Sequence, residues 1–232
     1  MSQSNAVPVV AVDGPGGVGK GTLCQQLAEH LGWHLLDSGS LYRLTAYAAD
    51  QAGVSLRDSA GLCEVAQNLD VSFAAGADGV LAMLAGEDVT AAIRTESAGR
   101  SASIVATDPA VRTALIGRQR AFARLPGLIA DGRDMGSVVF PEAELKIFLT
   151  ASVAERTHRR YKQLKDKGMN VSLPALSRDM EARDRRDSER SAAPLRACDD
   201  ARILNSTELS IEAVFKTALA WVAEAYPETV KG

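Results

Sequence analysis

The sequence predicts an α/β domain in which a parallel sheet is covered by helices on both faces. Short apolar segments alternate with helical stretches along almost the whole chain, and most of these segments lack the polar alternation of a half-exposed strand. A glycine-rich loop directly follows the first of them. The 232 residues, 46% of them apolar and 24% charged, suit one such domain with a small insertion.

Five segments are expected to form the sheet, because each is short, apolar and bounded by turn or helix signals. They are Val7–Val12, His34–Asp37, Leu128–Asp131, Leu145–Thr150 and Arg202–Asn205. Helices are expected at 19–31, at 110–122 behind an Asp108 cap, from the capping-box pattern Ser152–Glu155, and at 210–226.

One region interrupts this alternation. Residues 70–90 carry apolar residues grouped between glycines at 76, 79 and 86, which is the pattern of a small antiparallel meander. We expect an inserted subdomain over residues 64–105, within a single domain that spans residues 1–232.

The glycine-rich segment reads Gly-Pro-Gly-Gly-Val-Gly-Lys-Gly-Thr and has the setting of a phosphate-binding loop, or P-loop: a strand before it and a helix after it. Glycines let backbone N–H groups approach a polyphosphate, and the helix adds its positive dipole end. Lys20 can reach the β- and γ-phosphates. We therefore expect a P-loop NTPase-type fold, with the triphosphate held by Gly14, Pro15, Gly16, Gly17, Val18, Gly19, Lys20, Gly21 and Thr22.

The loop differs from most P-loops at one position. Gly21 stands where a Ser or Thr usually holds Mg²⁺, and the hydroxyl comes one residue later, at Thr22. We expect no direct protein ligand for Mg²⁺, which would be held by phosphate oxygens and water near Thr22. The Gly-Lys-Gly-Thr sequence resembles the loop of nucleoside monophosphate kinases.

Two further strand ends carry charged residues. Ser38 and Gly39 open a helix after the second strand, and Arg43, one turn in, is expected to clamp a phosphate rather than to lie free on the surface. Asp131 closes the third strand and is expected to orient water around Mg²⁺, with Arg133 and Asp134 projecting from the same edge.

Residues 156–190 hold eight arginines interleaved with acids. Such a pattern is typical of a solvated helix face with ion pairs. Beside a P-loop it also fits cations that converge on a phosphoryl-transfer site, and we favour this interpretation. The segment 156–172, an Arg-rich helix pair joined at Gly168, is expected to act as a lid.

Four motifs in order give a resemblance that covers nearly the whole chain. They are Val12-Asp13-Gly14-Pro15 with Gly-Lys-Gly-Thr22, Leu-Leu-Asp37-Ser38-Gly39 with Tyr42-Arg43, Asp131-Gly-Arg-Asp-Met-Gly136, and Arg183-Asp184-Arg-Arg-Asp187. Together with the inserted meander, they resemble the bacterial cytidylate kinases, a family of P-loop nucleoside monophosphate kinases.

The resemblance implies transfer of the γ-phosphoryl group of ATP, with Mg²⁺, to CMP or dCMP, and little use of UMP. It places Lys20, the loop amides, Arg159 and Arg160 at ATP, with Arg156 in the same lid. It places Ser38, Arg43 and Arg133 around the CMP phosphate, Ser103, Arg112 and Asp134 at cytosine, and Arg183 and Asp187 at the sugar. Arg190 would reach the acceptor phosphate, the transferring group or both, and the catalytic set would be Lys20, Asp131, Arg133 and Arg190.

Composition and charge argue against several other kinds of binding partner and site. A formal net charge of −3 argues against nucleic-acid binding through bulk positive charge, and no long apolar run or signal-peptide pattern is found. Three scattered cysteines indicate neither a disulfide framework nor a zinc site. We expect a cytoplasmic monomer that acts on small molecules, with neither nucleic acid nor membrane as partner.

Two alternatives stay open on the residues alone. Another monophosphate kinase, acting on AMP, GMP or UMP, would share the phosphate-binding motifs, since a few side chains set base choice. A nucleotide-dependent switch or regulatory ATPase is the other, although Gly21 and the wealth of arginine argue against it.

Overall fold

The protein is described here by a computed structural model that covers residues 7–76, 79–166 and 168–229. It divides into two compact units. Unit 1 comprises Met1–Asp37 and Arg120–Gly232, and unit 2 comprises Ser38–Gln119. Each unit has its own cluster of buried apolar side chains.

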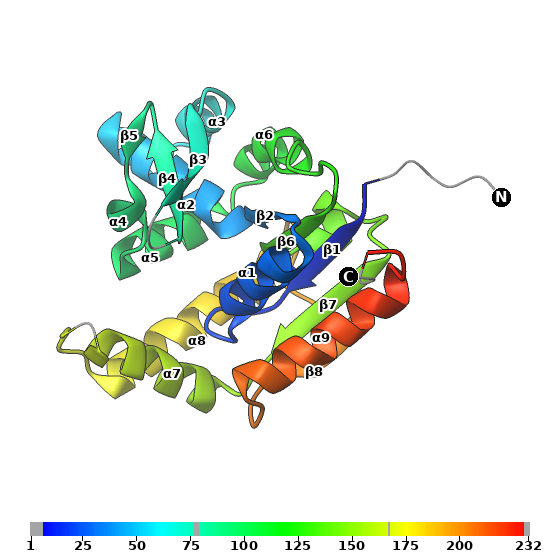
Figure 1. The fold of residues 1–232 in the computed structure, drawn as a ribbon. Helices are drawn as coiled ribbons and strands as arrows, with labels where there is room; N and C mark the ends of the chain where they lie inside the picture. Colours follow the sequence, from blue (N-terminus) through cyan, green and yellow to red (C-terminus); the bar gives the residue numbers. More distant parts are fainter. Residues whose placement is uncertain (1–6, 77–78, 167, 230–232) are drawn as a thin grey trace. The chain divides into compact units, whose positions relative to one another are not determined.

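Unit 1 is built on a parallel sheet of five strands in the order β2-β6-β1-β7-β8 (Figure 1). The strands are β1 (Val9–Asp13), β2 (His34–Asp37), β6 (Leu128–Gly132), β7 (Leu145–Thr150) and β8 (Arg202–Asn205). The sheet thus has the predicted strands, three of them with the predicted bounds. Because neighbouring strands run parallel, their carboxyl ends share one edge, where α/β sheets bind ligands.

The first strand is shifted from its predicted position. It was expected at Val7–Val12, but Val9 is the first residue paired with β6 and Asp13 still pairs with Gly132 and Phe148. Pro8 has no N–H to continue the ladder and contributes only its carbonyl, which accepts from Leu128 N. Asp13 therefore belongs to the sheet, directly before the P-loop.

Helices cover this sheet. Side chains of α1 (Lys20–Leu31) and α9 (Ile211–Ala225) pack into one core with β1 and β7, through residues such as Leu27, Val214 and Val222. Val12 points into that core, so Asp13 points to the opposite face. There it meets the short π-helix η1 (Met135–Val139).

The charged segment forms α7 (Val153–Asp166) and α8 (Leu173–Glu189). Gly168 closes α7 in the left-handed region, with the two hydrogen bonds of a Schellman motif, Gly168 N to Lys165 O and Met169 N to Leu164 O. Since α8 begins at Leu173, the expected helix pair within 156–172 is wrong: that segment holds most of α7 and the connection only.

Helix caps follow the sequence signals closely. The Ser210 hydroxyl accepts from Ala213 N at the start of α9, and Asp108 accepts from Ala110 N and Val111 N at the start of α6 (Pro109–Arg120). The capping box at Ser152 is only half formed. Its hydroxyl accepts from Glu155 N, but the Glu155 carboxylate accepts from Arg159, and Ser152 N donates to Thr207 Oγ1 instead.

Unit 2 contains the predicted meander as an antiparallel sheet of β3 (Val71–Gly76), β4 (Gly79–Leu84) and β5 (Glu87–Asp88). Residues 77 and 78 lie outside the described part of the chain. Helices α2 (Ser38–Gln51), α3 (Ser59–Gln67), α4 (Thr90–Ile93), α5 (Glu96–Val105) and most of α6 complete the unit. It therefore extends beyond residues 64–105 at both ends.

Among the described residues, no helix has the length and apolar character needed to cross a membrane.

Candidate active site

The P-loop connects β1 to α1 and needs glycine for two separate reasons. A methyl group on Gly14, which has φ 149°, would lie 2.0 Å from the carbonyl oxygen of Leu149 on β7. Gly17 has φ 80°, and a methyl group there would lie 2.9 Å from Cε of Met180 on α8. The loop is thus packed tightly between the sheet and α8, and its backbone conformation is one that other residues rarely adopt.

Lys20 is the first residue of α1 and is buried. Its Nζ donates to the Pro15 carbonyl at 2.9 Å and lies 3.9 Å from Oδ1 of Asp131. Burial lowers the pKa of Lys20 to about 8, with Arg133 acting in the same direction and Asp131 against it. The ammonium group of Lys20 therefore lies against the P-loop.

Asp131, near the end of β6, faces this lysine. Burial raises its pKa to about 6, although the charge of Lys20 opposes the shift. Its Oδ2 would lie 3.8 Å from a methyl group on Gly21, so the carboxylate stands beside the turn of α1 that carries Thr22. Oxygen donors of this kind suit Mg²⁺ and its water.

Arg133 and Arg183 approach the loop from β6 and α8. A methyl group on Gly16 would lie 3.4 Å from Nη1 of Arg183 and 3.6 Å from Nη2 of Arg133. Arg133 Nε also donates to Oδ2 of Asp187 at 2.9 Å. Burial alone would raise the pKa of Asp187, but Arg133 and Arg183 hold it below its ordinary value. Three cations, Lys20, Arg133 and Arg183, thus lie around the P-loop. The carboxylates of Asp131 and Asp187 lie close to Lys20 and Arg133 respectively.

Asp134 and Arg190 form a second buried pair of predicted site residues. Nη2 of Arg190 lies 3.7 Å from Oδ1 of Asp134, and Arg190 Nε donates to the carbonyl of Ala193. Both side chains are buried. Ala193 itself has φ 51°, an uncommon conformation for a residue with a side chain, and it turns its carbonyl back toward Arg190.

Asp13 was not predicted as a site residue, yet it fixes the segment that carries Arg133 and Asp134. Its two carboxylate oxygens accept from Met135 N and Gly136 N, each at 2.8 Å. Burial raises its pKa to about 6 despite these two bonds. The signal available in the sequence was an acid at the end of an otherwise apolar strand.

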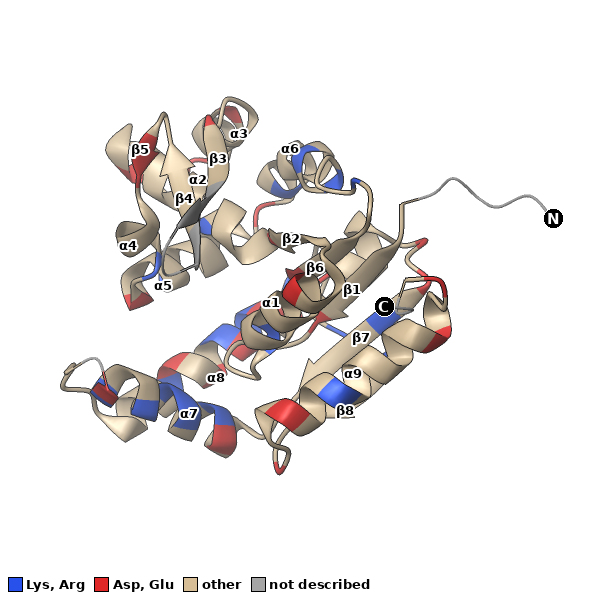
Figure 2. Ribbon diagram, viewed as in Figure 1, with Lys and Arg blue, Asp and Glu red and all other residues tan. Residues whose placement is uncertain are grey.

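The predicted lid arginines have different surroundings. Figure 2 shows basic and acidic residues interleaved along α7. Arg156 is buried and donates to Gly16 O and to Asp184. Arg159 pairs with Glu155 at 2.8 Å and donates to Ser206 O at 2.6 Å. Arg160 donates to Gln163 on its own helix.

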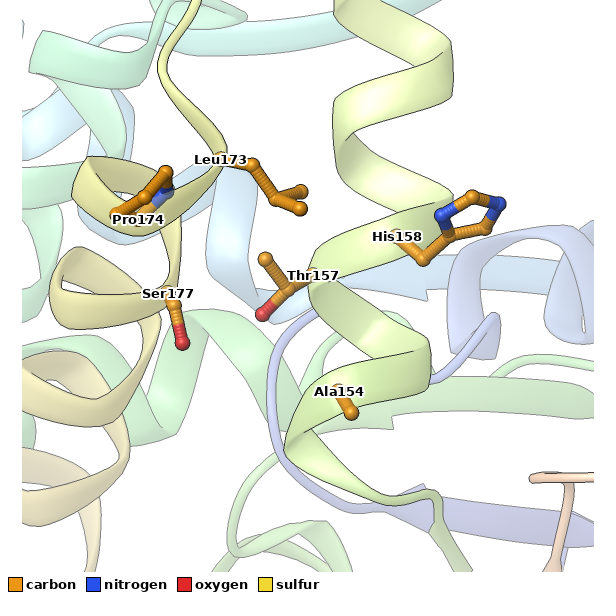
Figure 3. Close-up of a pocket in the computed structure, with 6 residues that line it drawn as sticks. All are labelled: Ala154, Thr157, His158, Leu173, Pro174 and Ser177. Carbon is orange, nitrogen blue, oxygen red and sulfur yellow. The ribbon is translucent and has the colours of Figure 1, made fainter.

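A pocket of about 350 Å³ lies between α7 and α8 (Figure 3). Leu173 points from α8 toward Thr157 on α7. The lining residues are Ala154, Thr157, His158, Leu173, Pro174 and Ser177. None of them was predicted to bind nucleotide.

Unit 2 holds four predicted site residues. Arg43 on α2 donates through Nη1 to Ile93 O at 2.7 Å and Thr95 O at 3.2 Å. Arg112 on α6 is buried, donates to Ala106 O at 3.1 Å, and stacks 5.6 Å above the ring centroid of Tyr42. Ser38 and Ser103 are buried as well. Each arginine is therefore held in a fixed place on its own unit.

No group of three or more His, Cys, Asp or Glu side chains suited to a metal ion occurs among the described residues.

Comparison with known proteins gives one consistent family. The family model described as cytidylate kinase matches residues 10–224. A protein named cytidylate kinase from Nitrosococcus oceani is 54% identical over 222 residues, which cover 95% of this chain and 98% of that protein. Proteins of the same name from Pseudomonas aeruginosa and Aeromonas hydrophila are 57% and 55% identical, each over more than nine-tenths of both chains.

Proposed function

The chain belongs to the cytidylate kinase family, and on that premise we propose how its residues divide the work of the reaction. The enzyme transfers the γ-phosphoryl group of ATP to CMP or dCMP, giving ADP and CDP or dCDP. The observation that carries the assignment of roles is the gathering of Lys20, Arg133 and Arg183 around the P-loop.

The chemistry needs cations more than it needs a base. The acceptor is already an anionic phosphate oxygen, so no strong general base is required. Two polyanions must approach each other, however, and their repulsion must be cancelled in a site of low dielectric constant. Buried arginines whose guanidinium groups stay protonated meet this need. In support, the carboxylates beside Arg133 raise its pKa although burial lowers it.

For ATP, we assign the P-loop from Gly14 to Thr22, with Lys20 on the transferring group and Arg159 and Arg160 from α7. Arg159 donates to the Ser206 carbonyl, and its Nη1 lies 3.5 Å from the carbonyl oxygen of Val18 in the P-loop. These contacts support a position of Arg159 beside the loop. Arg190 and Arg133 complete the catalytic set with Lys20 and Asp131.

For CMP, we assign Ser38, Arg43 and Arg133 to the phosphate, Ser103, Arg112 and Asp134 to cytosine, Arg183 and Asp187 to the sugar, and Arg190 to the phosphate. Unit 2 is the monophosphate-binding subdomain in this proposal. The fixed geometry of Arg43 and Arg112 supports it, because an ordered donor loses little entropy when it binds.

Mg²⁺ is the metal that this site fits. The Asp131 carboxylate on β6 and the Thr22 hydroxyl on the first turn of α1 are hard oxygen donors, suited to an ion that keeps most of its water. When bound, the ion would neutralise charge on the phosphate oxygens. We further propose a cytoplasmic monomer, in keeping with small nucleotide substrates.

The test is a panel of phosphorylation assays. The protein is incubated with Mg·ATP and, separately, CMP, dCMP, UMP, AMP and GMP, and ADP is measured. We expect turnover with CMP and dCMP and little ADP without an acceptor. Lys20→Ala should abolish turnover while the circular-dichroism spectrum is kept. Equal rates with purine monophosphates would contradict the base assignment, and acceptor-independent hydrolysis would favour a switch-type ATPase.

A further inference from the structure

One face of α8 is built against the phosphate loop. Met180, Arg183, Asp184 and Asp187 follow the i, i+3, i+4, i+7 spacing that aligns side chains on one side of a helix. Met180 packs on Gly17 and Arg183 on Gly16, while Asp187 pairs with Arg133. Asp184 is the charged member of this row that the nucleotide assignments leave without a role.

Asp184 is joined to the loop through Arg156 of α7. Nη2 of Arg156 donates to Oδ2 of Asp184 at 2.5 Å, and Nη1 donates both to Oδ1 of Asp184 at 3.1 Å and to the Gly16 carbonyl at 3.0 Å. Nε donates to the Ala151 carbonyl just after β7. Arg156 is 3% exposed. One planar guanidinium group thus links the sheet, the P-loop and α8.

This link fixes a particular peptide group. In a trans peptide, the carbonyl of one residue and the N–H of the next point in opposite directions. Because Arg156 holds the Gly16 carbonyl, the N–H of Gly17 must point away from Arg156. A loop that binds phosphate with its backbone depends on such N–H directions, and the loop carbonyl that would repel an anion is held on the protein side.

We propose that Arg156 and Asp184 are positioning residues that set the P-loop backbone and align it with the cations of α8 for phosphoryl transfer. The inference rests on the proposed function. It gives Arg156 a fixed structural task within α7, distinct from contact with ATP by a moving lid, because its described donors are committed to protein acceptors.

The experiment compares Arg156→Lys, Asp184→Asn and the double variant with the unmodified enzyme. A lysine cannot bridge three acceptors in one plane, and an asparagine offers only one acceptor oxygen. We expect kcat to fall by about ten- to a hundredfold in each single variant, because misalignment costs rate, while KM for CMP changes by less than about threefold. The double variant should be no worse than the poorer single one, since both changes break the same link.

The control is Arg185→Lys, an exposed arginine beside Asp184 on the same helix. It should keep the kcat of the unmodified enzyme. Hydrogen exchange of the peptide that spans residues 10–22 is the second readout, and it should quicken in Asp184→Asn but not in the control. Asp184→Glu keeps the carboxylate and should recover part of the lost kcat, and it replaces Asp184→Asn in the comparison if that variant folds poorly.

Two results would overturn the inference: losses in kcat that multiply in the double variant, or single variants that match Arg185→Lys in both kcat and loop exchange. Neither touches the proposed function, which would fail only if the unmodified protein did not phosphorylate CMP.

Discussion

At the scale of single residues, burial shifts the pKa values of two charged side chains in the site, Lys20 and Asp131. Lys20 and Asp131 face each other at 3.9 Å, and burial shifts both of their pKa values toward the neutral form of each group. Their mutual attraction opposes the shift. Lys20 therefore titrates with a pKa of about 8, much closer to neutral pH than an ordinary lysine, and a bound phosphate should favour its charged form.

Activity should accordingly depend on pH through Lys20. With a pKa of about 8 in the free enzyme, Lys20 loses its proton well before an ordinary lysine, so kcat/KM for ATP should decline as pH rises through about 8. Lys20→Arg, which stays charged, should move this decline to higher pH even if its rate is low. A profile for the unmodified enzyme that is flat from pH 7 to about 9.5 would contradict this.

The same shift has a consequence for stability. Between pH 8 and 10.5 the unfolded chain holds the Lys20 proton more tightly than the folded protein does. The contribution of Lys20 to the free energy of unfolding should therefore increase with pH across that window.

Asp13 should matter for folding more than for binding. Asp13→Ala would leave two buried N–H groups without their acceptor and should lower the free energy of unfolding by about 2–5 kcal/mol. Asp13→Asn keeps one acceptor oxygen and gains an NH₂ donor, so its free energy of unfolding should lie between those of Asp13→Ala and the unmodified protein. Urea denaturation measures both, and Asp166→Ala, at an exposed position at the end of α7, should change little.

Sequence reasoning predicts a residue's place most directly when that place follows from local spacing. Lys20 lies in a loop that is recognisable over nine consecutive residues. Asp13 and Asp184 were missed as supports because their partners lie far away in the chain, at Met135 and Arg156. Such contacts depend on strand order and helix packing, which no local pattern encodes.

At the scale of elements, one hairpin turn departs from the usual backbone preferences. The connection between β4 and β5 has positive φ at both central residues, 48° at Ala85 and 83° at Gly86, as in a type I′ turn. Alanine is a poor choice for the first of these positions, where asparagine is favoured.

Ala85→Asn should therefore stabilise the protein, by about 0.5–1 kcal/mol, because it relieves the strain of alanine at positive φ. Ala85→Val should destabilise it, since a β-branched side chain tolerates this conformation worst. Thermal denaturation compares the two variants. A lower melting temperature for Ala85→Asn than for the unmodified protein would show that the turn is not limiting.

The α7 segment and its connection should respond to nucleotide. We expect Mg·ATP to slow hydrogen exchange within residues 156–172 as the part of this segment beyond the fixed Arg156 closes and excludes water. The core helix α9 (Ile211–Ala225) is the internal reference and should change little. Equal exchange with and without nucleotide across residues 156–172 would argue against a lid.

Strand positions were predictable because buried parallel strands are short apolar runs, and three of five had the predicted bounds. The helices of unit 2 were harder. α4 (Thr90–Ile93) is too short to show a helical period, and α5 is rich in small and polar residues, so no run of large apolar side chains marks either helix in the sequence. The half-formed capping box shows the same limit: Glu155 found a better partner in Arg159.

At the scale of the whole molecule, the proposed roles divide between the two units, with ATP assigned to unit 1 and the monophosphate to unit 2. Unit 1 carries the P-loop and the cations around it, whereas unit 2 carries Arg43 and Arg112 with their fixed supports. The sequence predicted an insertion around the meander, but the flanking helices could not be assigned to it, since their apolar faces look alike in either unit.

Base preference should depend on unit 2. In the proposed site, cytosine leaves no buried polar group unpaired, and uracil does. One such group costs about 1–3 kcal/mol, so CMP should be preferred over UMP by about ten- to a hundredfold in kcat/KM. Arg112→Met should reduce this ratio far more than it changes KM for ATP. Arg118→Met, on the same helix, is the control, and a ratio that is unchanged in Arg112→Met would remove that residue from base recognition.

The strand order also constrains how the chain acquires its fold. β1 lies between β6 and β7, and Val9 pairs with Leu128, so the whole of unit 2 is made before the first strand finds a neighbour. During synthesis, β1 and the P-loop therefore stay without a strand partner while unit 2, which has its own apolar cluster, can already fold. Pairing across so long a separation is slow. Nucleotide binding should thus emerge late in biosynthesis, only after β7 has left the ribosome.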